Sequence, residues 1–280
     1  MRLADYVVRF LYSKGIDTIF TVSGGGSIFL CDALHQFKKI KYVCCHHEQA
    51  VSYAVEGYAR TKMIPGAAIV TTGPGGTNTV SGVSACWIDS IPSIFISGQV
   101  FLSQTISHNK VTRQIGVQEI NIVDIVKPIT KYAKIVTEAD KIKFYLEKAY
   151  HICQEGRPGP VWLDIPADLQ SLKLDTNTLK SFVPNIKNKR NLKVDKLISL
   201  VAQKILKAKS PVIHFGHGAR LEGCGELIKK LLKKCQIPFA LTWNASDLMD
   251  SKHDLYIGRP GAFSERGTNF IIQNCDLYIS

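Results

Sequence analysis

Apolar and polar positions near the start of the chain follow the period of a helix. Leu3, Val7, Phe10 and Leu11 fall on one stripe that stops before Gly15, and glycine commonly ends helices. Short runs rich in β-branched and aromatic residues then alternate with helical patterns. The predicted strands are residues 18–22, 41–45, 67–72 and 93–98, and the predicted helices are residues 27–36, 48–62 and 78–88. This alternation predicts an α/β fold in which helices cover both faces of a buried parallel sheet.

The same pattern resumes after a polar interval. Residues 156–166 predict one more strand, and residues 170–194 lack clear periodicity, so we place a domain boundary near residue 180. The second α/β pattern comprises a helix, a strand, a helix and two further apolar runs, namely residues 195–207, 211–215, 226–234, 237–243 and 274–280. We therefore expect two consecutive parallel-sheet domains, residues 1–180 and 181–280. The final run predicts a buried strand with no helix behind it, so we expect the second domain to be truncated.

Composition narrows the class of protein. Hydrophobic residues make up 45% of the 280 residues and charged residues 21%, which excludes disordered and fibrous chains. No apolar run approaches the length of a membrane span, and Arg9 interrupts the first apolar stretch, so we expect a cytoplasmic protein without a membrane partner. The eight cysteines form no C-x-x-C pair. They predict reduced thiols, with neither a disulfide framework nor a zinc site.

The positive charge is concentrated in one window. The net charge is +12, and residues 180–234 hold 14 Lys and Arg against three acids. This window is rich in Lys and nearly lacks aromatic residues, whereas nucleic-acid surfaces combine Arg with aromatics. It therefore predicts solvated helix faces, and we expect no nucleic-acid partner.

Polar and glycine residues gather where predicted strands end. The candidate loops are residues 23–26, 46–50, 73–78 and 98–99, and carboxyl ends of parallel strands carry ligand sites. A glutamate such as Glu48 in a first helical turn has a purely structural explanation in the helix dipole. His46 and His47 are adjacent, so their side chains diverge and we predict no metal site. The loops together predict a cleft for a mostly neutral heterocycle.

Four runs carry a resemblance to a known family. TIFTVSGGGSIFLCDAL, CCHHEQAVSYAVEGYAR, IVTTGPGGTNTVSGVSACWIDSIPSIFISGQV and GRPGPVWLDIP resemble the N-terminal pyrimidine-binding domain of thiamine diphosphate enzymes of the acetolactate synthase type. The resemblance covers about residues 1–170. Residues 195–280 resemble the start of the central, flavin-binding domain of that family.

The resemblance implies roles for individual residues. Glu48 would be the catalytic carboxylate that hydrogen-bonds the cofactor's aminopyrimidine and passes a proton. The other implied residues of this domain are Gly25, Gly26, Gly73, Pro74 and Asn78 for the cofactor, and Gln99 and Gln118 for the substrate. In the second domain, Gly216, Gly218 and Thr242 would contact flavin. FAD stays open, because Leu221 stands where a dinucleotide fingerprint has its third glycine.

Departures from the family pattern affect the expected substrate and metal. Val22 and Ser23 replace a usual Tyr-Pro pair, and Val117 replaces a usual Phe, which favours a larger acceptor such as a ketosugar. His108 is followed by Asn109, which argues against a simple pyruvate decarboxylase. The family's GDG motif for magnesium and diphosphate does not occur in the sequence, so the magnesium site is not expected in this chain.

The resemblance implies a transferase that decarboxylates a 2-keto acid such as pyruvate and transfers the two-carbon unit to a second keto acid or a ketosugar. Its partners would be a second copy of the chain or a complementary diphosphate-binding chain. Two alternatives remain open: a non-catalytic remnant or one half of a split enzyme, and an oxidoreductase that binds a nicotinamide at Gly216–Gly218. Against the latter, Thr242 and Trp243 stand where an acidic residue would be expected.

Overall fold

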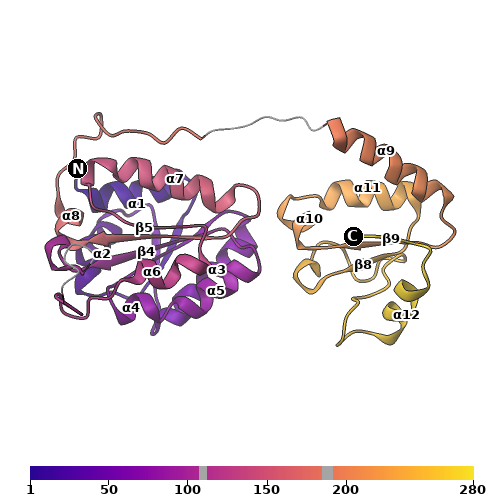
Figure 1. The fold of residues 1–280 in the computed structure, drawn as a ribbon, viewed down its shortest axis with the longest axis horizontal. Coiled ribbons are helices and arrows are strands. Elements are labelled where there is room, and N and C mark those ends of the chain that lie inside the picture. The colour runs from indigo at the N-terminus through magenta and orange to yellow at the C-terminus, as the bar shows by residue number, and fades with distance from the viewer. Residues whose placement is uncertain (107–111, 185–191) are drawn as a thin grey trace. The chain divides into compact units, whose positions relative to one another are not determined.

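The fold is described from a computed structural model, whose described residues are 1–106, 112–184 and 192–280. The chain forms two compact units, Met1–Asn185 and Ile186–Ser280. Each contains a parallel sheet with helices packed against it (Figure 1). The predicted α/β class with two parallel sheets is therefore confirmed. Within the described residues, every helix is too short or too polar to traverse a lipid bilayer.

The first unit is built on a six-stranded parallel sheet. Its strands are β1 (Thr18–Thr21), β2 (Lys41–Cys44), β3 (Gly66–Val70), β4 (Ser93–Gln99), β5 (Tyr132–Ile135) and β6 (Pro160–Pro166). They lie in the order β2-β1-β3-β4-β6-β5. Because β2 lies on one side of β1 and β3 on the other, the chain reverses direction across the sheet between β1 and β3. A crevice at the carboxyl ends of such strands is the usual ligand site of this architecture.

Helices cover both faces of this sheet (Figure 1). The α-helices of the unit are α1 (Leu3–Ser13), α2 (Ile28–Gln36), α3 (Glu48–Lys62), α4 (Pro74–Thr77), α5 (Val80–Ile88), α6 (Ile122–Val126), α7 (Ile142–Gln154) and α8 (Ala167–Ser171). Side chains alternate along the strands. Ile69 and Ile94 belong to the core that includes α1, α2 and α7, whereas Phe95 and Trp162 belong to the core with α3, α5 and α6.

Strand β2 departs from the sequence prediction. All of its residues are exposed, with Tyr42 at 44% and Val43 at 43% of their full accessible surface. The expectation that every strand is buried between helices was wrong here because β2 is the edge of the sheet. The following helix, α3, packs Val51 and Val55 against the core around β3 instead.

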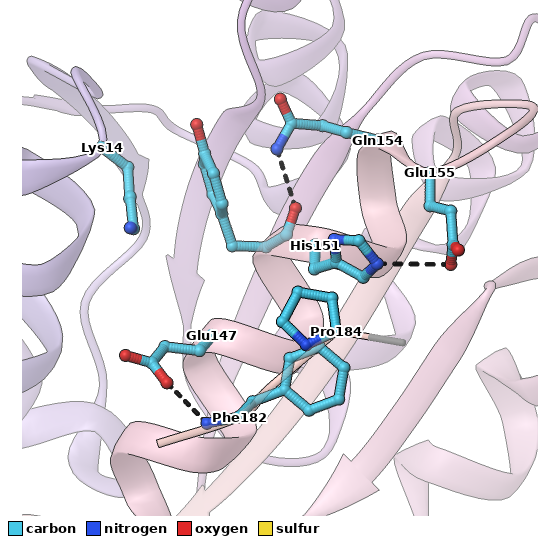
Figure 2. Close-up of a pocket in the computed structure, with 8 residues that line it drawn as sticks. Lys14, Glu147, His151, Gln154, Glu155, Phe182 and Pro184 are labelled. Atoms are coloured by element: carbon cyan, nitrogen blue, oxygen red, sulfur yellow. Dashed lines mark hydrogen bonds and ion pairs between the residues drawn. The ribbon is translucent and has the colours of Figure 1, made fainter. Parts of the chain in front are cut away.

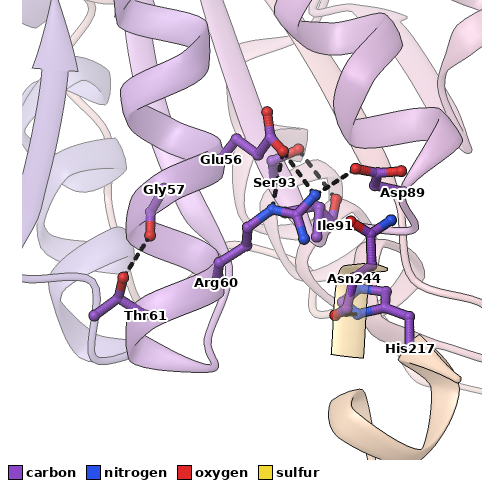
Figure 3. Close-up of polar contacts among 9 residues, drawn as sticks. All are labelled: Glu56, Gly57, Arg60, Thr61, Asp89, Ile91, Ser93, His217 and Asn244. Carbon is purple, nitrogen blue, oxygen red and sulfur yellow. Dashed lines mark hydrogen bonds and ion pairs between the residues drawn. The ribbon is translucent and has the colours of Figure 1, made fainter. Parts of the chain in front are cut away.

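A network of charges joins α3 to the turn before β4 (Figure 3). Arg60 donates from Nε to Glu56 at 2.9 Å and also forms an ion pair with Asp89. Asp89 is the C-terminal cap of α5, so the guanidinium links two helices on the same face of the sheet. The network lies in the C-terminal half of α3, which begins at Glu48 and ends at Lys62.

The second unit has a three-stranded parallel sheet in the order β8-β7-β9. Its elements are α9 (Leu192–Lys207), β7 (Pro211–Phe215), α10 (His217–Leu221), α11 (Gly225–Cys235), β8 (Phe239–Leu241), α12 (Arg266–Asn274) and β9 (Leu277–Ile279). Ile228 and Leu232 of α11 pack on Ile213 and Phe239 of the sheet. The last strand was predicted to be buried, and this was wrong. Tyr278 is 45% exposed because β9 is an edge strand.

Candidate active site

A cavity of about 350 Å³ opens at the carboxyl edge of the six-stranded sheet. It lies at the reversal between β1 and β3, because the loops that follow these two strands form its walls. The residues that line it are Gly24, Gly25, Gly26, Thr71, Thr72, Gln99, Val100, Phe101, Gln104, Val117, Gln118 and Ala167. Four predicted site residues, Gly25, Gly26, Gln99 and Gln118, are therefore brought together here.

The glycine loop after β1 is held in place from two sides. The backbone N–H of Gly26 donates to Thr71 Oγ1 at 3.1 Å, and Gln170 Nε2 donates to the Gly26 carbonyl at 2.7 Å. A Cβ at Gly98 would lie 2.0 Å from that carbonyl, so only glycine permits this approach of β4 to the loop. By contrast, a Cβ at Gly25 would meet no atom within 4 Å. A side chain at Gly25 would therefore clash with no other part of the protein.

Glu48 begins α3 after strand β2. His47 caps this helix, because its Nδ1 accepts a hydrogen bond from the Gln49 N–H at 3.1 Å. Asn78 Nδ2 donates to Glu48 Oε2 at 2.9 Å, which pairs two residues that the sequence placed in separate loops. The other carboxylate oxygen, Oε1, lies 3.7 Å from the position of a Cβ at Gly75. Glu48 does not line the cavity itself. Thr71, which does, lies near the same position, because a Cβ at Gly75 would also meet Thr71 Cγ2 at 2.6 Å.

Gly73 supports the opposite wall. Its φ of 58° lies in the left-handed region, and a Cβ there would lie 2.1 Å from the carbonyl oxygen of Gln118. Gly73 thus permits close contact between the β3 loop and the segment that carries Gln118, which also has a positive φ of 57°. Pro74 is exposed and begins α4, where its missing N–H costs no hydrogen bond.

Gln99 is 2% exposed, and its hydrogen bonds are made within the protein. Its Oε1 accepts from Thr72 Oγ1 and from the Val100 N–H, while its Nε2 donates to the Ile120 carbonyl and to Asp164. The amide therefore forms part of the cavity floor with its donors and acceptors occupied. The predicted substrate contact of Gln99 stays a prediction. Gln118 is exposed, so its side-chain amide is more accessible to a ligand than that of Gln99.

A buried acid lies beneath the floor. Asp164 accepts from Ser97 Oγ at 2.5 Å and from Gln99 Nε2 at 3.0 Å, and Trp162 Nε1 donates to Ser97 Oγ at 2.8 Å. Burial raises the pKa of Asp164 to about 7. The two hydrogen bonds oppose that increase, and the negative charge of Glu119 adds to it.

Sequence reasoning missed several residues of this site. The missed residues that hold its loops or floor are Thr71, Thr72, Ser97, Asp164 and Gln170. One signal was available: the sequence VWLDIP places a single acid inside a strand that is otherwise apolar. A buried acid of this kind needs hydrogen-bond donors around it.

The predicted flavin residues lie in the segments that follow β7 and β8 at the carboxyl edge of the second sheet. A Cβ at Gly216 would lie 3.8 Å from Thr242 Cγ2, whereas one at Gly218 would face open space. Thr242 Oγ1 is buried and has no hydrogen-bond partner within the described part of the chain. The ring of His217 and the carbonyl of Asn244 are 2.9 Å apart (Figure 3). Within the described residues, Thr242 Oγ1 is therefore a group of this loop that a polar ligand would satisfy.

A separate cavity of about 500 Å³ lies on α7 beside the segment that follows Leu179 (Figure 2). Glu147 accepts there from the Phe182 N–H at 2.7 Å, and His151 lies 3.5 Å from Glu155. None of the predicted site residues line it. Among the described residues, no three His, Cys, Asp or Glu side chains are grouped as a metal site requires. His108 and Asn109 lie outside the described residues.

Two family models define the class of protein. Residues 1–127 match the thiamine pyrophosphate enzyme, N-terminal TPP binding domain, and residues 198–280 match the thiamine pyrophosphate enzyme, central domain. The chain belongs to the thiamine pyrophosphate enzyme family.

Within this family, the chain is similar to acetolactate synthase large subunits. It is 32% identical over 276 residues to the acetolactate synthase isozyme 1 large subunit of Escherichia coli, a match that covers 99% of this chain and 47% of the relative. It is 30% identical to the Lactococcus lactis large subunit, over 99% of this chain and 47% of that protein. A probable large subunit of Methanococcus aeolicus is 32% identical over 100% and 46%. The chain thus spans about half the length of the curated relatives it matches.

Proposed function

We propose that this chain supplies the pyrimidine-binding half of a thiamine diphosphate active site of the acetolactate synthase type. The reaction is decarboxylation of a 2-keto acid such as pyruvate and transfer of the two-carbon unit to a second keto acid or a ketosugar. The observation that carries the proposal is the Glu48–Asn78 pair, whose Asn78 Nδ2 lies 2.9 Å from Glu48 Oε2. It lies beside the cavity at the reversal of the sheet.

The residues present fit half of such a cofactor. Asn78 occupies Oε2, and no residue of the described ranges donates to Oε1. Oε1 could therefore hold a proton against a ring nitrogen of a pyrimidine. Gly75 is needed on that side because a Cβ there would lie 2.6 Å from Thr71 Cγ2, while Glu48 Oε1 would be at ordinary contact distance, 3.7 Å. Thiamine diphosphate, when bound, supplies an acidic carbon that adds to a ketone and an electron sink for loss of carbon dioxide. Gly25 and Gln118, at the open parts of the cavity, would orient the keto acid.

The anchor for magnesium and diphosphate must come from residues outside this sequence, which contains no GDG motif. We therefore propose a partner, either a second copy or a complementary diphosphate-binding chain. The unpaired edge strand β2, with exposed Tyr42 and Val43, supports such a contact because an open sheet edge favours association. Sedimentation should show association that Val43→Lys weakens. The matched variant Val183→Lys, at an exposed position outside the sheet, should leave it unchanged.

The test of the proposed function is proton exchange at the reactive carbon of bound cofactor. In the complete protein, or with the diphosphate domain supplied as a second chain, Glu48→Gln should slow this exchange by about 10²–10⁴-fold, the usual contribution of acid–base catalysis. Cofactor binding should largely survive. The matched control is Glu56→Gln, the same change on the same helix at a residue paired with Arg60, which should exchange at the parent rate.

Two results would contradict the proposal. If the Glu48→Gln variant exchanges the proton at the parent rate, Glu48 is not the activating carboxylate. If the parent protein neither binds the cofactor nor exchanges the proton, the remnant alternative is favoured instead.

We also propose that the second unit binds FAD through Gly216, Gly218 and Thr242. The buried, unpartnered Thr242 Oγ1 within the described residues supports this, because a polar ligand would satisfy it. The absorbance spectrum of the purified protein distinguishes flavin from nicotinamide. Thr242→Val should lower the flavin content of the protein, whereas Thr105→Val in the first unit should not.

A further inference from the structure

A continuous chain of hydrogen bonds runs from the core to the cavity. Trp162 Nε1 donates to Ser97 Oγ, so the Ser97 hydroxyl is free to donate to Asp164 Oδ1. Gln99 Nε2 donates to the second oxygen, Oδ2. Both oxygens of Asp164 therefore act as acceptors, which is the pattern that an ionised carboxylate satisfies.

The orientation of Gln99 is fixed by this arrangement. Its Oε1 accepts from Thr72 and from the Val100 N–H, so a flip of the amide would face two donors with an NH₂ group. Its Nε2 also donates to the Ile120 carbonyl at 3.1 Å, which ties the segment of Gln118 to β4. Gln99, Thr72 and Gln118 all line the cavity.

Protonation of Asp164 would disturb this network. A neutral acid carries a hydrogen on one oxygen, and donors already point at both oxygens. A proton on Oδ2 would face the NH₂ group of Gln99, which cannot accept, so Gln99 would have to move or lose this hydrogen bond. A proton on Oδ1 would require the Ser97 hydroxyl to turn from donor to acceptor. The groups of β4 that face Asp164, Ser97 and Gln99, do not titrate, and the residue after β5, Val136, donates its N–H to the Asp164 backbone carbonyl. The charged group that acts on Asp164 is Glu119, whose Oε1 accepts from the Ile106 N–H.

We propose that Asp164 is a proton-linked positioning residue of the cavity, which fixes the amide of Gln99 and, through it, the segment that carries Gln118. Ionised Asp164 holds the cavity in the geometry described above, and neutral Asp164 releases it. Burial places the pKa of Asp164 at about 7, so the change falls near neutral pH. The consequence for keto-acid binding rests on the proposed function, whereas the link between protonation and geometry does not.

The test follows three nitrogen signals of the chain labelled with ¹⁵N-Trp and ¹⁵N-Gln between pH 5.5 and 8.5. The signals are the Trp162 indole, the Gln99 side-chain amide and the Gln118 backbone amide. All three should titrate with one midpoint near pH 7. The change should disappear in Asp164→Asn, and its midpoint should fall in Glu119→Gln because a raising charge is removed. Ser97→Ala should abolish the Trp162 response and raise the midpoint of the two Gln signals, because the Ser97 hydrogen bond that lowers the pKa of Asp164 is lost. This variant separates the two arms of the network.

Three outcomes would overturn the inference: no titration in the parent, an unchanged titration in Asp164→Asn, or a Gln118 signal that does not follow Gln99. In the complete protein, KM for pyruvate should change at least threefold across the same midpoint, and Asp164→Asn should remove that dependence while kcat changes less. An identical pH profile of KM in parent and variant would also overturn it. Failure of the proposed function would appear separately, as absent cofactor proton exchange with the nitrogen titrations intact.

Discussion

Asp164 should make the stability of the first unit depend on pH in an unusual direction. Its pKa is 3.8 in an unperturbed chain and about 7 in the fold. Between these values the folded state keeps a proton that the unfolded state releases, so the free energy of unfolding falls as pH rises. The contribution of neutral Asp164 is fully present below about pH 4 and is lost above about pH 7. At 1.36 kcal/mol per pH unit, the total is about 4 kcal/mol.

The variant Asp164→Asn isolates this term. Asparagine has nearly the same shape as aspartate and does not titrate. Its NH₂ group would face a donor, and the free energy of unfolding lost through this mismatch is the same at every pH. The unfolding free energy of the variant minus that of the parent should therefore rise by about 4 kcal/mol from pH 4 to pH 7 and be flat above pH 8. Other shifted groups, such as Asp5 and Asp17, whose hydrogen-bonded partners lower their pKa values, cancel in the difference.

Urea unfolding followed by Trp162 fluorescence measures this difference, with Trp87 and Trp243 replaced by Phe because both are exposed. With a urea slope of about 2 kcal/mol per M, the gap between the two midpoints should change by about 2 M. A gap that is constant from pH 4 to pH 8 would show that Asp164 is ionised at low pH in the fold. A gap that changes in the opposite direction below pH 4 would show that its hydrogen bonds outweigh its burial.

Three further outcomes are expected. Gly98→Ala should lower stability by about 3 kcal/mol in urea unfolding, because its Cβ would lie 2.0 Å from the Gly26 carbonyl; unchanged stability would exclude that contact. Gly25→Ala should leave stability within about 0.5 kcal/mol while weakening ligand binding in titration calorimetry, since its Cβ meets no atom and Gly25 lines the cavity. Arg220→Lys should raise the pKa of Asp247 measured by NMR, because the guanidinium fork at 2.7 Å holds it below its usual value; no change would mean that the fork is absent in solution.

Much of the first unit could be predicted from local pattern. The runs at residues 18–22, 67–72 and 93–98 correspond to β1, β3 and β4, because buried parallel strands are short, apolar and separated by helical periods. Strand β5 and helices α6 and α7 were missed. The four residues of β5 are all only half-buried and include Lys134, so this strand lacks the apolar run that identified the others.

The sequence predicted which loops form the site but not which of these loops contact one another. Parallel topology brings every strand's carboxyl end to one edge, which is why the loop of Gly25 and Gly26 could be grouped with the end of the strand at residues 93–98. Gln118 was implied by the family resemblance and not by this pattern. The strand order decides which loops touch. Because β3 lies next to β1, Thr71 can accept from the Gly26 N–H, and no local pattern encodes that neighbour.

Sheet register accounts for the residues that sequence reasoning missed. Ser97 stands opposite Asp164 in the β4–β6 ladder, one alternation beyond the Phe95–Trp162 pair. The two pairs therefore lie one after the other on the same face of the sheet. The rings of Phe95 and Trp162 are stacked with centroids 5.6 Å apart, and the hydroxyl of Ser97 and the carboxyl of Asp164 lie nearer the carboxyl edge. Gln99 is the next residue of β4 on this face. Its side-chain amide, which was predicted to contact substrate, therefore donates a hydrogen bond to Asp164, 65 residues away in the chain. The β4–β6 ladder therefore connects core packing to cavity geometry, and a substitution of Asp164 should alter the cavity although Asp164 itself does not line it.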